Sequence, residues 1–174
     1  MINPGELLFV VDEENKPIGR LPRHIVHEKG LFHRTTGIWV LNSNKEILCQ
    51  RRSLKKDIEP GKMEAFFGGH VDAGQSYEDN AVREVAEELG IQVPKKDLKF
   101  IGVFKSDKPT HREFQGEFAL KLTKIEVFTP EADEITSLEW HSLEELKKIL
   151  MEENNPDWVH KYWDTEIFTF LEAL

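Results

Sequence analysis

The chain has 174 residues, of which 23 are basic and 32 acidic, so its formal net charge is −9. A hydrophobic content of 39%, with 11 Phe and 4 Trp, is enough for a packed core and excludes an intrinsically disordered protein. The length fits one domain, and the negative charge argues against a general nucleic-acid or anionic-membrane binder. The charge is uneven, because residues 1–65 carry net +2 and residues 66–174 carry net −11.

The N-terminus has no secretory pattern, since the apolar run at residues 7–11 is too short for a signal peptide and ends in three acidic residues. No stretch approaches the roughly 18 consecutive apolar residues that a membrane-spanning helix needs. The single cysteine, Cys49, cannot form an internal disulfide and lies in an apolar segment. We therefore expect a cytoplasmic protein that does not contact a membrane.

Strands dominate the predicted secondary structure. In chain order, the sequence predicts strands at 6–11 and 17–21, a short helix at 22–29, a hairpin of 38–41 and 46–50, a basic loop at 51–62, a helix at about 77–89, strands at 98–105, 112–122 and 135–141, and tail helices at 142–152 and 156–172. Strands mixed with a few helices, without regular alternation, indicate an α+β domain with a mixed sheet.

The helix at 77–89 carries the most informative pattern. Ser76 is suited to cap its first turn, and Gly90 stands where a left-handed residue ends a helix. Opposite an apolar face, Glu84, Glu87 and Glu88 are three and four residues apart, so their carboxylates can converge. Any surface helix has a charged face, but three neighbouring carboxylates repel one another unless a cation such as Mg²⁺ lies between them.

The flanks of this helix make the pattern specific. From Gly69 to Ile91 the sequence reads G-x5-Q-x7-R-E-V-A-E-E-L-G-I, which resembles the Nudix box, G-x5-E-x7-R-E-U-x-E-E-x-G-U, where U is aliphatic. Eight of the nine defining positions match: Gly69, Arg83, Glu84, Val85, Glu87, Glu88, Gly90 and Ile91. The ninth, Gln75, replaces a glutamate.

The resemblance implies a single Nudix domain over residues 1–174, with a mixed sheet between helices (α/β/α), an N-terminal extension at 1–33 and a helical tail at 154–174. It also implies cleavage of a small-molecule diphosphate by metal-activated water, with Mg²⁺ as cofactor and Mn²⁺ as an alternative. The implied metal ligands and catalytic carboxylates are Glu84, Glu87 and Glu88, with the Gly68 carbonyl completing the coordination. Arg83 would orient a box glutamate.

Gln75 is a departure from the pattern that bears on activity. A neutral amide can accept a hydrogen bond from Arg83, but it contributes no charge and cannot act as a base. Because the replaced glutamate usually has a supporting role, the resemblance implies a lower rate or altered metal affinity, and not an inactive protein.

The N-terminal half resembles one branch of the family, the isopentenyl diphosphate isomerases and related hydrolases. In the isomerases, histidines at the positions of His27, His33 and His70 bind a metal together with two later glutamates, of which Glu117 matches one. Gln115 stands at the other, and Glu117 is interpreted as a metal ligand or a catalytic base. Basic residues matching Arg52 and Lys56 hold the diphosphate.

The isomerase reaction needs a cysteine just before the third histidine, and Gly68 stands there. With the box glutamates retained, the resemblance favours a hydrolase over an isomerase. A Nudix module that binds a diphosphate without cleaving it also stays open.

Each candidate site residue has a structural alternative. The histidines are compatible with ordinary half-buried side chains, the basic loop with a solvated surface, and Glu117 with a solvated sheet face. The tail aromatics Trp158, Trp163 and Phe168 either pack in the core or face a second subunit of a homodimer, and the sequence leaves both open.

Overall fold

The computed structural model describes residues 6–56, 58–108, 111–124, 126–151, 155–159 and 165–174. Its elements in chain order are β1 (Leu7–Val11), β2 (Pro17–Pro22), α1 (Arg23–Glu28), β3 (His33–Leu41), β4 (Glu46–Arg52), β5 (Met63–Glu64), α2 (Tyr77–Leu89), the 3₁₀ turn η1 (Lys95–Asp97), β6 (Leu98–Lys108), β7 (His111–Lys121), β8 (Ile135–Ser142), α3 (Leu143–Met151) and α4 (Thr165–Ala173). None of the helices within these residues is long and apolar enough to span a bilayer.

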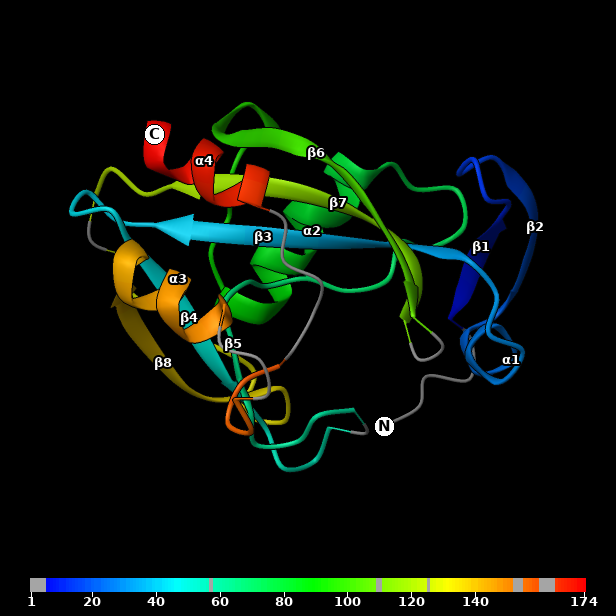
Figure 1. The fold of residues 1–174 in the computed structure, drawn as a ribbon, viewed down its shortest axis with the longest axis horizontal. Helices are drawn as coiled ribbons and strands as arrows, with labels where there is room; N and C mark the ends of the chain where they lie inside the picture. Colours follow the sequence, from blue (N-terminus) through cyan, green and yellow to red (C-terminus); the bar gives the residue numbers. More distant parts are fainter. Residues whose placement is uncertain (1–5, 57, 109–110, 125, 152–154, 160–164) are drawn as a thin grey trace.

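Strand β3 organises an eight-stranded mixed sheet (Figure 1). Its nine residues pair in parallel with β7, and β6 pairs antiparallel with β7 on the other side. At its start, β3 pairs with β1, which carries β2. Strands β4 and β8 pair antiparallel and join β3 only near the hairpin, at Leu41 and Ile47. The predicted α+β class with a mixed sheet is confirmed.

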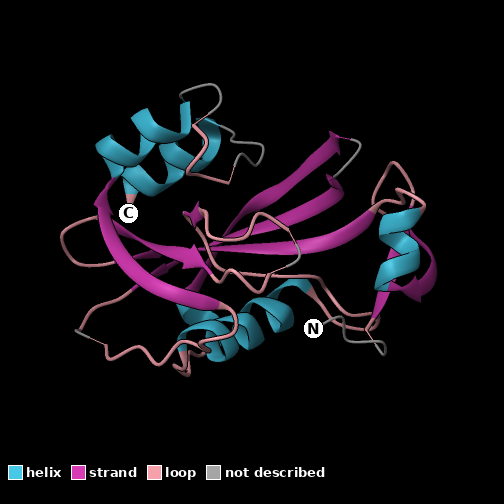
Figure 2. Cartoon of the chain, turned by 90° about the horizontal axis from the view of Figure 1, so that it is seen from below, coloured by secondary structure: helices cyan, strands magenta, loops and turns pink. Residues whose placement is uncertain are grey.

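Helices cover both faces of the sheet because the side chains of β3 alternate between them. Ile38 and Val40 share a core with the apolar face of α2, whereas Trp39 and Leu41 share a second core with α3 and α4. Figure 2 shows the resulting layers, with α2 on one face and α3 and α4 on the other. This is the α/β/α arrangement that the sequence predicts.

Helix α2 has the bounds and caps that its sequence indicates. The hydroxyl of Ser76 accepts a hydrogen bond from the Asp79 amide at 3.1 Å. At the other end Gly90 adopts a left-handed φ of 70°, where a Cβ would lie 2.0 Å from Thr129 Oγ1. The amphipathic pattern therefore places the apolar face of α2 in the core. On the opposite face Glu87 is exposed, whereas Glu84 and Glu88 are buried beneath the loop that precedes the helix.

The tail differs from its prediction. A helix was expected over 156–172. Among the described residues of this range, 156–159 are not helical and α4 covers 165–173, while Trp158 forms a parallel bridge with Met63 of β5. The amide of Val159 also donates to Met63 O at 2.8 Å. Pairing with β5 thus overrides helical periodicity at 156–159. Trp158 and Phe168 both pack in the core, and Trp163 lies outside the described residues.

Strand β3 starts five residues earlier than predicted, at His33 instead of residue 38. Thr35, Thr36 and Gly37 lack the apolar character of a buried strand, but β7 pairs along one side of them. On the other side, the loop before α2 supplies partners, since the Thr36 amide donates to Gly69 O at 2.9 Å. This early part of β3 places the loop that contains Gly68, Gly69 and His70.

Candidate active site

A cavity of about 1160 Å³ lies where α2, the loop before it, the basic loop and the N-terminal segment meet. The residues singled out from the sequence that line it are His27, Arg52, Lys56, Gly68, Gly69, His70, Arg83, Glu84, Glu87 and Glu88. His33 is buried beside His27 and His70, whereas Glu117 is not among the lining residues. The fold therefore collects most of the candidate residues at one place.

Two glycines allow the loop to pass directly over the carboxylates of α2. The Gly68 amide donates to Glu88 Oε2 at 2.8 Å, and a Cβ at Gly69 would lie 2.8 Å from Glu84 Oε1. Gly68 has a φ of 148°, and a Cβ there would lie 2.1 Å from Thr36 O. Any larger residue at either position would displace the loop or the carboxylates.

The charged forms of two box glutamates are disfavoured by their surroundings in the protein. Burial raises the pKa of Glu84 to about 7, with the charge of Arg83 opposing and that of Glu87 adding to the rise. Burial also raises the pKa of Glu88, and the charges of Glu84 and Glu64 raise it further. A divalent cation with oxygen ligands would remove this cost, so these residues fit the group that the sequence implies.

Arg83 orients two of the carboxylates. Its Nη1 donates to Glu87 Oε2 at 2.7 Å, and its Nη2 donates to Glu84 Oε1 at 2.8 Å and to Asn80 Oδ1 at 2.6 Å. Its Nε is buried without a hydrogen-bond partner in the described part of the chain, and so is Gln75 Oε1. The hydrogen bond from Arg83 Nε to Gln75 Oε1 that the sequence allows is therefore not formed in the described residues.

We expect Gln75→Glu to raise Mg²⁺ affinity about fivefold, because a carboxylate here adds negative charge near the cluster, a change worth about 1 kcal/mol. Isothermal titration with Mg²⁺ measures the change. Gln92→Glu adds the same charge at an exposed position just after α2 and should leave the affinity unchanged. Equal affinities for Gln75→Glu and the wild type would show that the ninth position does not matter.

The basic loop presents Arg52 and Lys56 to the cavity, where acidic side chains hold them. Arg52 Nη1 donates to Glu64 Oε2 at 2.8 Å, and its Nη2 donates to Ile58 O at 2.9 Å. Lys56 forms an ion pair with Glu134, and its charge lowers the pKa of Glu84 and of Glu88 against the effect of burial. Lys56 is thus within electrostatic reach of the carboxylates of α2, whereas Arg52 is paired with Glu64.

Several lining carboxylates were not identified from the sequence. Glu64 is buried in β5, and its only sequence signal is that it is the single charged residue in the segment 63–67. Glu131, Asp133 and Glu134 line the cavity from the loop before β8. Asp133 of this loop pairs with Lys55 of the basic loop at 2.5 Å, and the neighbouring Glu134 pairs with Lys56.

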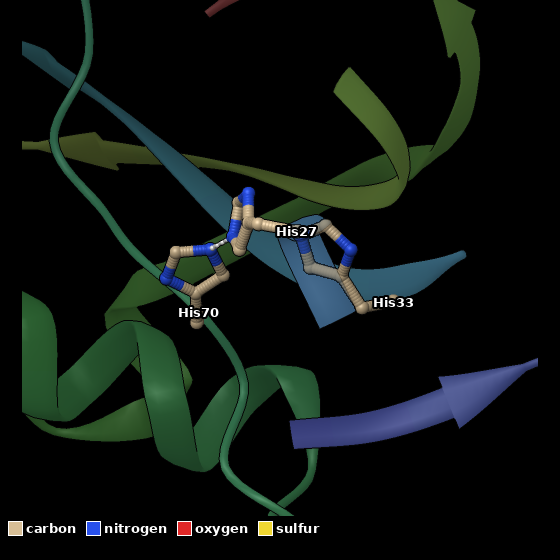
Figure 3. A group of neighbouring side chains, drawn as sticks. All are labelled: His27, His33 and His70. Carbon is tan, nitrogen blue, oxygen red and sulfur yellow. Dashed lines mark hydrogen bonds between the residues drawn. The ribbon is translucent and has the colours of Figure 1, made fainter. Parts of the chain in front are cut away.

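The three histidines converge from α1, β3 and the loop before α2 (Figure 3). His27 Nε2 and His70 Nε2 are 2.9 Å apart, and one ligand atom from each of the three rings lies within 4.8 Å of the others. His33 Nδ1 is 3.0 Å from Leu31 O, and its Nε2 is buried without a hydrogen-bond partner in the described residues. An orphaned imidazole nitrogen facing two others fits a divalent metal site.

Burial lowers the pKa of His33 to about 4, and the neighbouring charge of His70 lowers it further, against the hydrogen bond to Leu31. His33 is therefore neutral at physiological pH, which is the state that ligates a metal.

Glu117 lies on β7 opposite Gly37 and accepts a hydrogen bond from Trp39 Nε1 at 2.9 Å. Glu113, four residues earlier on the same strand, pairs in register with His33 and lines the cavity. The charge of Glu113 also raises the pKa of His33 against burial. Glu113 is therefore a β7 carboxylate beside His33 that the sequence did not single out, whereas Glu117 contacts Trp39.

The N-terminal segment forms another wall of the cavity, with Glu6 as its acidic residue. Glu6 Oε1 lies 3.4 Å from His70 Nδ1, and Glu6 Oε2 lies 3.8 Å from Arg23 Nε. Burial alone would raise the pKa of Glu6, but the hydrogen bond with His70 and the charges of His70, Arg23 and Arg83 outweigh it, so the pKa is lowered.

Comparison with known proteins adds independent information. The family model described as NUDIX domain matches residues 31–162. An uncharacterized Nudix hydrolase of Pseudomonas aeruginosa is 44% identical over 115 residues, which cover 66% of this chain and 67% of that protein. Isopentenyl-diphosphate Delta-isomerase 2 of Photorhabdus laumondii is 27% identical over 169 residues, covering 95% of this chain and 92% of the isomerase.

Among solved structures, that of a Deinococcus radiodurans protein superposes with a TM-score of 0.74 at 21% sequence identity. The match covers 97% of this chain and 98% of the other. At this identity the similarity establishes the fold.

Proposed function

The chain belongs to the Nudix family of hydrolases, which act on phosphorus-containing anhydrides, and from this we propose an Mg²⁺-dependent pyrophosphohydrolase. Its substrate would be a nucleoside diphosphate derivative or a similar small-molecule diphosphate. The observation that carries the proposal is the pair of buried carboxylates, Glu84 and Glu88, facing a cavity that also presents Arg52 and Lys56.

The roles of the protein groups follow from their positions. Glu84 and Glu88 would hold the cation with Glu87 and the Gly68 carbonyl, and Arg83 keeps Glu84 and Glu87 in place. When bound, Mg²⁺ neutralises phosphate oxygens and lowers the pKa of the attacking water. A carboxylate of the box, or one beside it, would accept the proton of that water.

The phosphate-binding role of Arg52 and Lys56 is supported by the kind of group with which they pair, because a phosphate could replace it. Both now pair with cavity carboxylates, Glu64 and Glu134. A diphosphate offers the same kind of anionic oxygens and can replace a carboxylate in either pair. The substrate would then lie between these cations and the carboxylates of α2.

We further propose that His27, His33 and His70 hold a second divalent cation, with Glu113 and Glu117 of β7 as the carboxylates that complete the site. The support is the convergence of the three rings and the orphaned His33 Nε2. Imidazole nitrogens favour a transition metal or Zn²⁺, whereas the carboxylates of α2 favour Mg²⁺ or Mn²⁺.

A panel of diphosphates tests the proposed reaction in the presence of Mg²⁺ or Mn²⁺. Nucleotide sugars, nucleoside triphosphates, dinucleotides and prenyl diphosphates cover the classes that the box allows. Metal-dependent release of phosphate or a monophosphate product is the expected result. Saturable binding without turnover across the panel would instead support a non-hydrolytic diphosphate-binding module.

Isomerase activity is disfavoured by the backbone at Gly68. A cysteine there would bring its Cβ to 2.1 Å from Thr36 O, at a φ of 148° that side chains rarely adopt. Cys49, the only thiol, is buried in the core around Trp39, and burial raises its pKa above its usual range. Neither position supplies the acid–base thiol that double-bond isomerisation requires.

We also propose that the protein acts in the reducing cytoplasm on a small molecule, without nucleic-acid or membrane partners. The supporting observations are the buried free thiol of Cys49 and the negative net charge. A homodimer stays a prediction, which the mass of the protein in solution tests.

A further inference from the structure

We propose that Glu6 is a positioning residue that fixes the ring of His70 and so presents His70 Nε2 to the cation of the histidine site. This inference rests on the proposed second cation site. It assigns a function to the first described residue of the N-terminal segment, which lies far from the Nudix box in the sequence.

Backbone hydrogen bonds join the segment around Glu6 to two other parts of the chain, the start of α1 and the loop before α2. The Arg23 amide at the start of α1 donates to Glu6 O at 3.0 Å. One residue later, Leu7 O accepts the Ala73 amide at 2.8 Å, and Leu8 forms an antiparallel bridge with Asp72. Strand β1 is therefore joined to the loop that carries His70, and the Glu6 carboxylate keeps a fixed position relative to the ring.

The two ring nitrogens of His70 have different neighbours. Nδ1 lies 3.4 Å from Glu6 Oε1, while Nε2 lies 2.9 Å from His27 Nε2. A proton on Nδ1 donated to the carboxylate leaves the lone pair of Nε2 pointing at the place where the three rings converge. Histidines that ligate metals commonly donate their other nitrogen to a carboxylate or a carbonyl in this way.

His33 shows the same division with a backbone acceptor. Its Nδ1 lies 3.0 Å from Leu31 O, and its Nε2 is the buried atom without a partner in the described residues. In two of the three rings, therefore, Nδ1 lies close to an acceptor oxygen and Nε2 is directed toward the other histidines. A role of Glu6 limited to pairing with Arg23 is a weaker account, because that pair is longer, at 3.8 Å.

The test uses the tautomer of His70 and the affinity for Co²⁺, with the carboxylates of α2 kept occupied by excess Mg²⁺. In the metal-free wild type, long-range ¹H–¹⁵N spectra should show His70 protonated at Nδ1. Glu6→Ala should reduce that tautomer and weaken Co²⁺ binding by about 10- to 100-fold. Glu6→Gln keeps an acceptor oxygen and should fall between the two.

Glu28→Ala removes the same charge from an exposed position on α1 and serves as the matched control, with both properties expected to equal the wild type. If Glu6→Ala and Glu6→Gln both keep the tautomer and the Co²⁺ affinity of the wild type, Glu6 does not position His70. Because Glu6→Gln preserves size and hydrogen-bonding capacity, it keeps the test decisive if Glu6→Ala folds poorly.

His33→Ala separates this inference from the site on which it rests. If the histidine site exists, this variant should lose one bound Co²⁺, seen in the visible d–d absorption. Retention of that ion would overturn the second cation site and the role of Glu6 with it. Loss of the ion in His33→Ala, together with wild-type behaviour of the Glu6 variants, would overturn the role of Glu6 alone.

Discussion

Glu84→Gln is expected to stabilise the metal-free protein at pH 8, by roughly 3 kcal/mol relative to the wild type. The pKa of Glu84 in the folded protein, about 7, lies above its ordinary value of 4.5. The stability linked to its protonation is complete below about pH 4.5 and is lost as the pH rises through 7. A glutamine resembles the protonated acid and keeps that stability at pH 8.

Thermal unfolding at pH 5 and pH 8, without and with saturating Mg²⁺, measures this effect. At pH 8 without metal, the variant should melt about 6–12 °C above the wild type, and at pH 5 the two should nearly coincide. With Mg²⁺ the order should reverse, because the wild type gains metal-binding free energy that the variant has lost. A variant less stable than the wild type at pH 8 without metal would contradict the account of Glu84.

The comparison must be made between the two proteins at each pH, because His33 has an opposite pH dependence. Its folded pKa of about 4 lies below the ordinary 6.5, so the stability linked to its neutral form is lost as the pH falls through that range. In the wild type alone this effect overlaps that of Glu84. The difference between wild type and Glu84→Gln cancels it, because His33 is present in both.

The part of the site that helical spacing alone predicts lies on one helix, whereas the histidines and basic residues were identified through the resemblance to a branch of the family. The positions of Glu84, Glu87 and Glu88 depend on helical geometry over five residues, and the caps at Ser76 and Gly90 fix where that helix begins and ends. These positions depend on residues that are close together in the sequence, so they can be predicted from the sequence alone. The same holds for the hairpin of β3 and β4, whereas the layer of α2 on the sheet was expected only from the resemblance to the Nudix family.

The rest of the site depends on strand pairing, which leaves little trace in a single sequence. Glu113 stands beside His33 because β7 runs parallel to β3 in one particular register. A shift by one residue would have turned its carboxylate to the opposite face of the sheet. Glu64 likewise reaches the cavity through a strand of two residues, β5, whose partner Gln50 is fourteen positions away.

Glu6 shows the same limit at the N-terminus. The sequence predicted a strand at 6–11, which begins with Glu6, but not that this strand would be joined to the loop at residues 72–73. That link between distant segments positions the carboxylate against His70. The tail is a further case, because Trp158 pairs with Met63 instead of continuing a helix.

Glu87→Gln is expected to lower kcat at least about a hundredfold while leaving the fold intact. Glu87 lines the cavity, and its side chain is about half exposed, so its removal costs little packing. The ion pair with Arg83 that is lost joins partly exposed groups, and such pairs contribute about 0.5 kcal/mol to stability. The variant should therefore bind the diphosphate and melt near the wild-type temperature.

Glu78→Gln is the matched control, since it makes the same change at an exposed position in the first turn of the same helix, outside the cavity lining. Steady-state rates with Mg²⁺, on a substrate identified by the diphosphate panel, compare the two variants with the wild type. A large loss of kcat in Glu87→Gln alone would locate the chemistry on the carboxylate face of α2. Equal rates in all three proteins would show that Glu87 is not a catalytic group. The half-exposed side chain of Glu87 contributes little to packing, so a change in the fold would not hide a catalytic effect of the substitution.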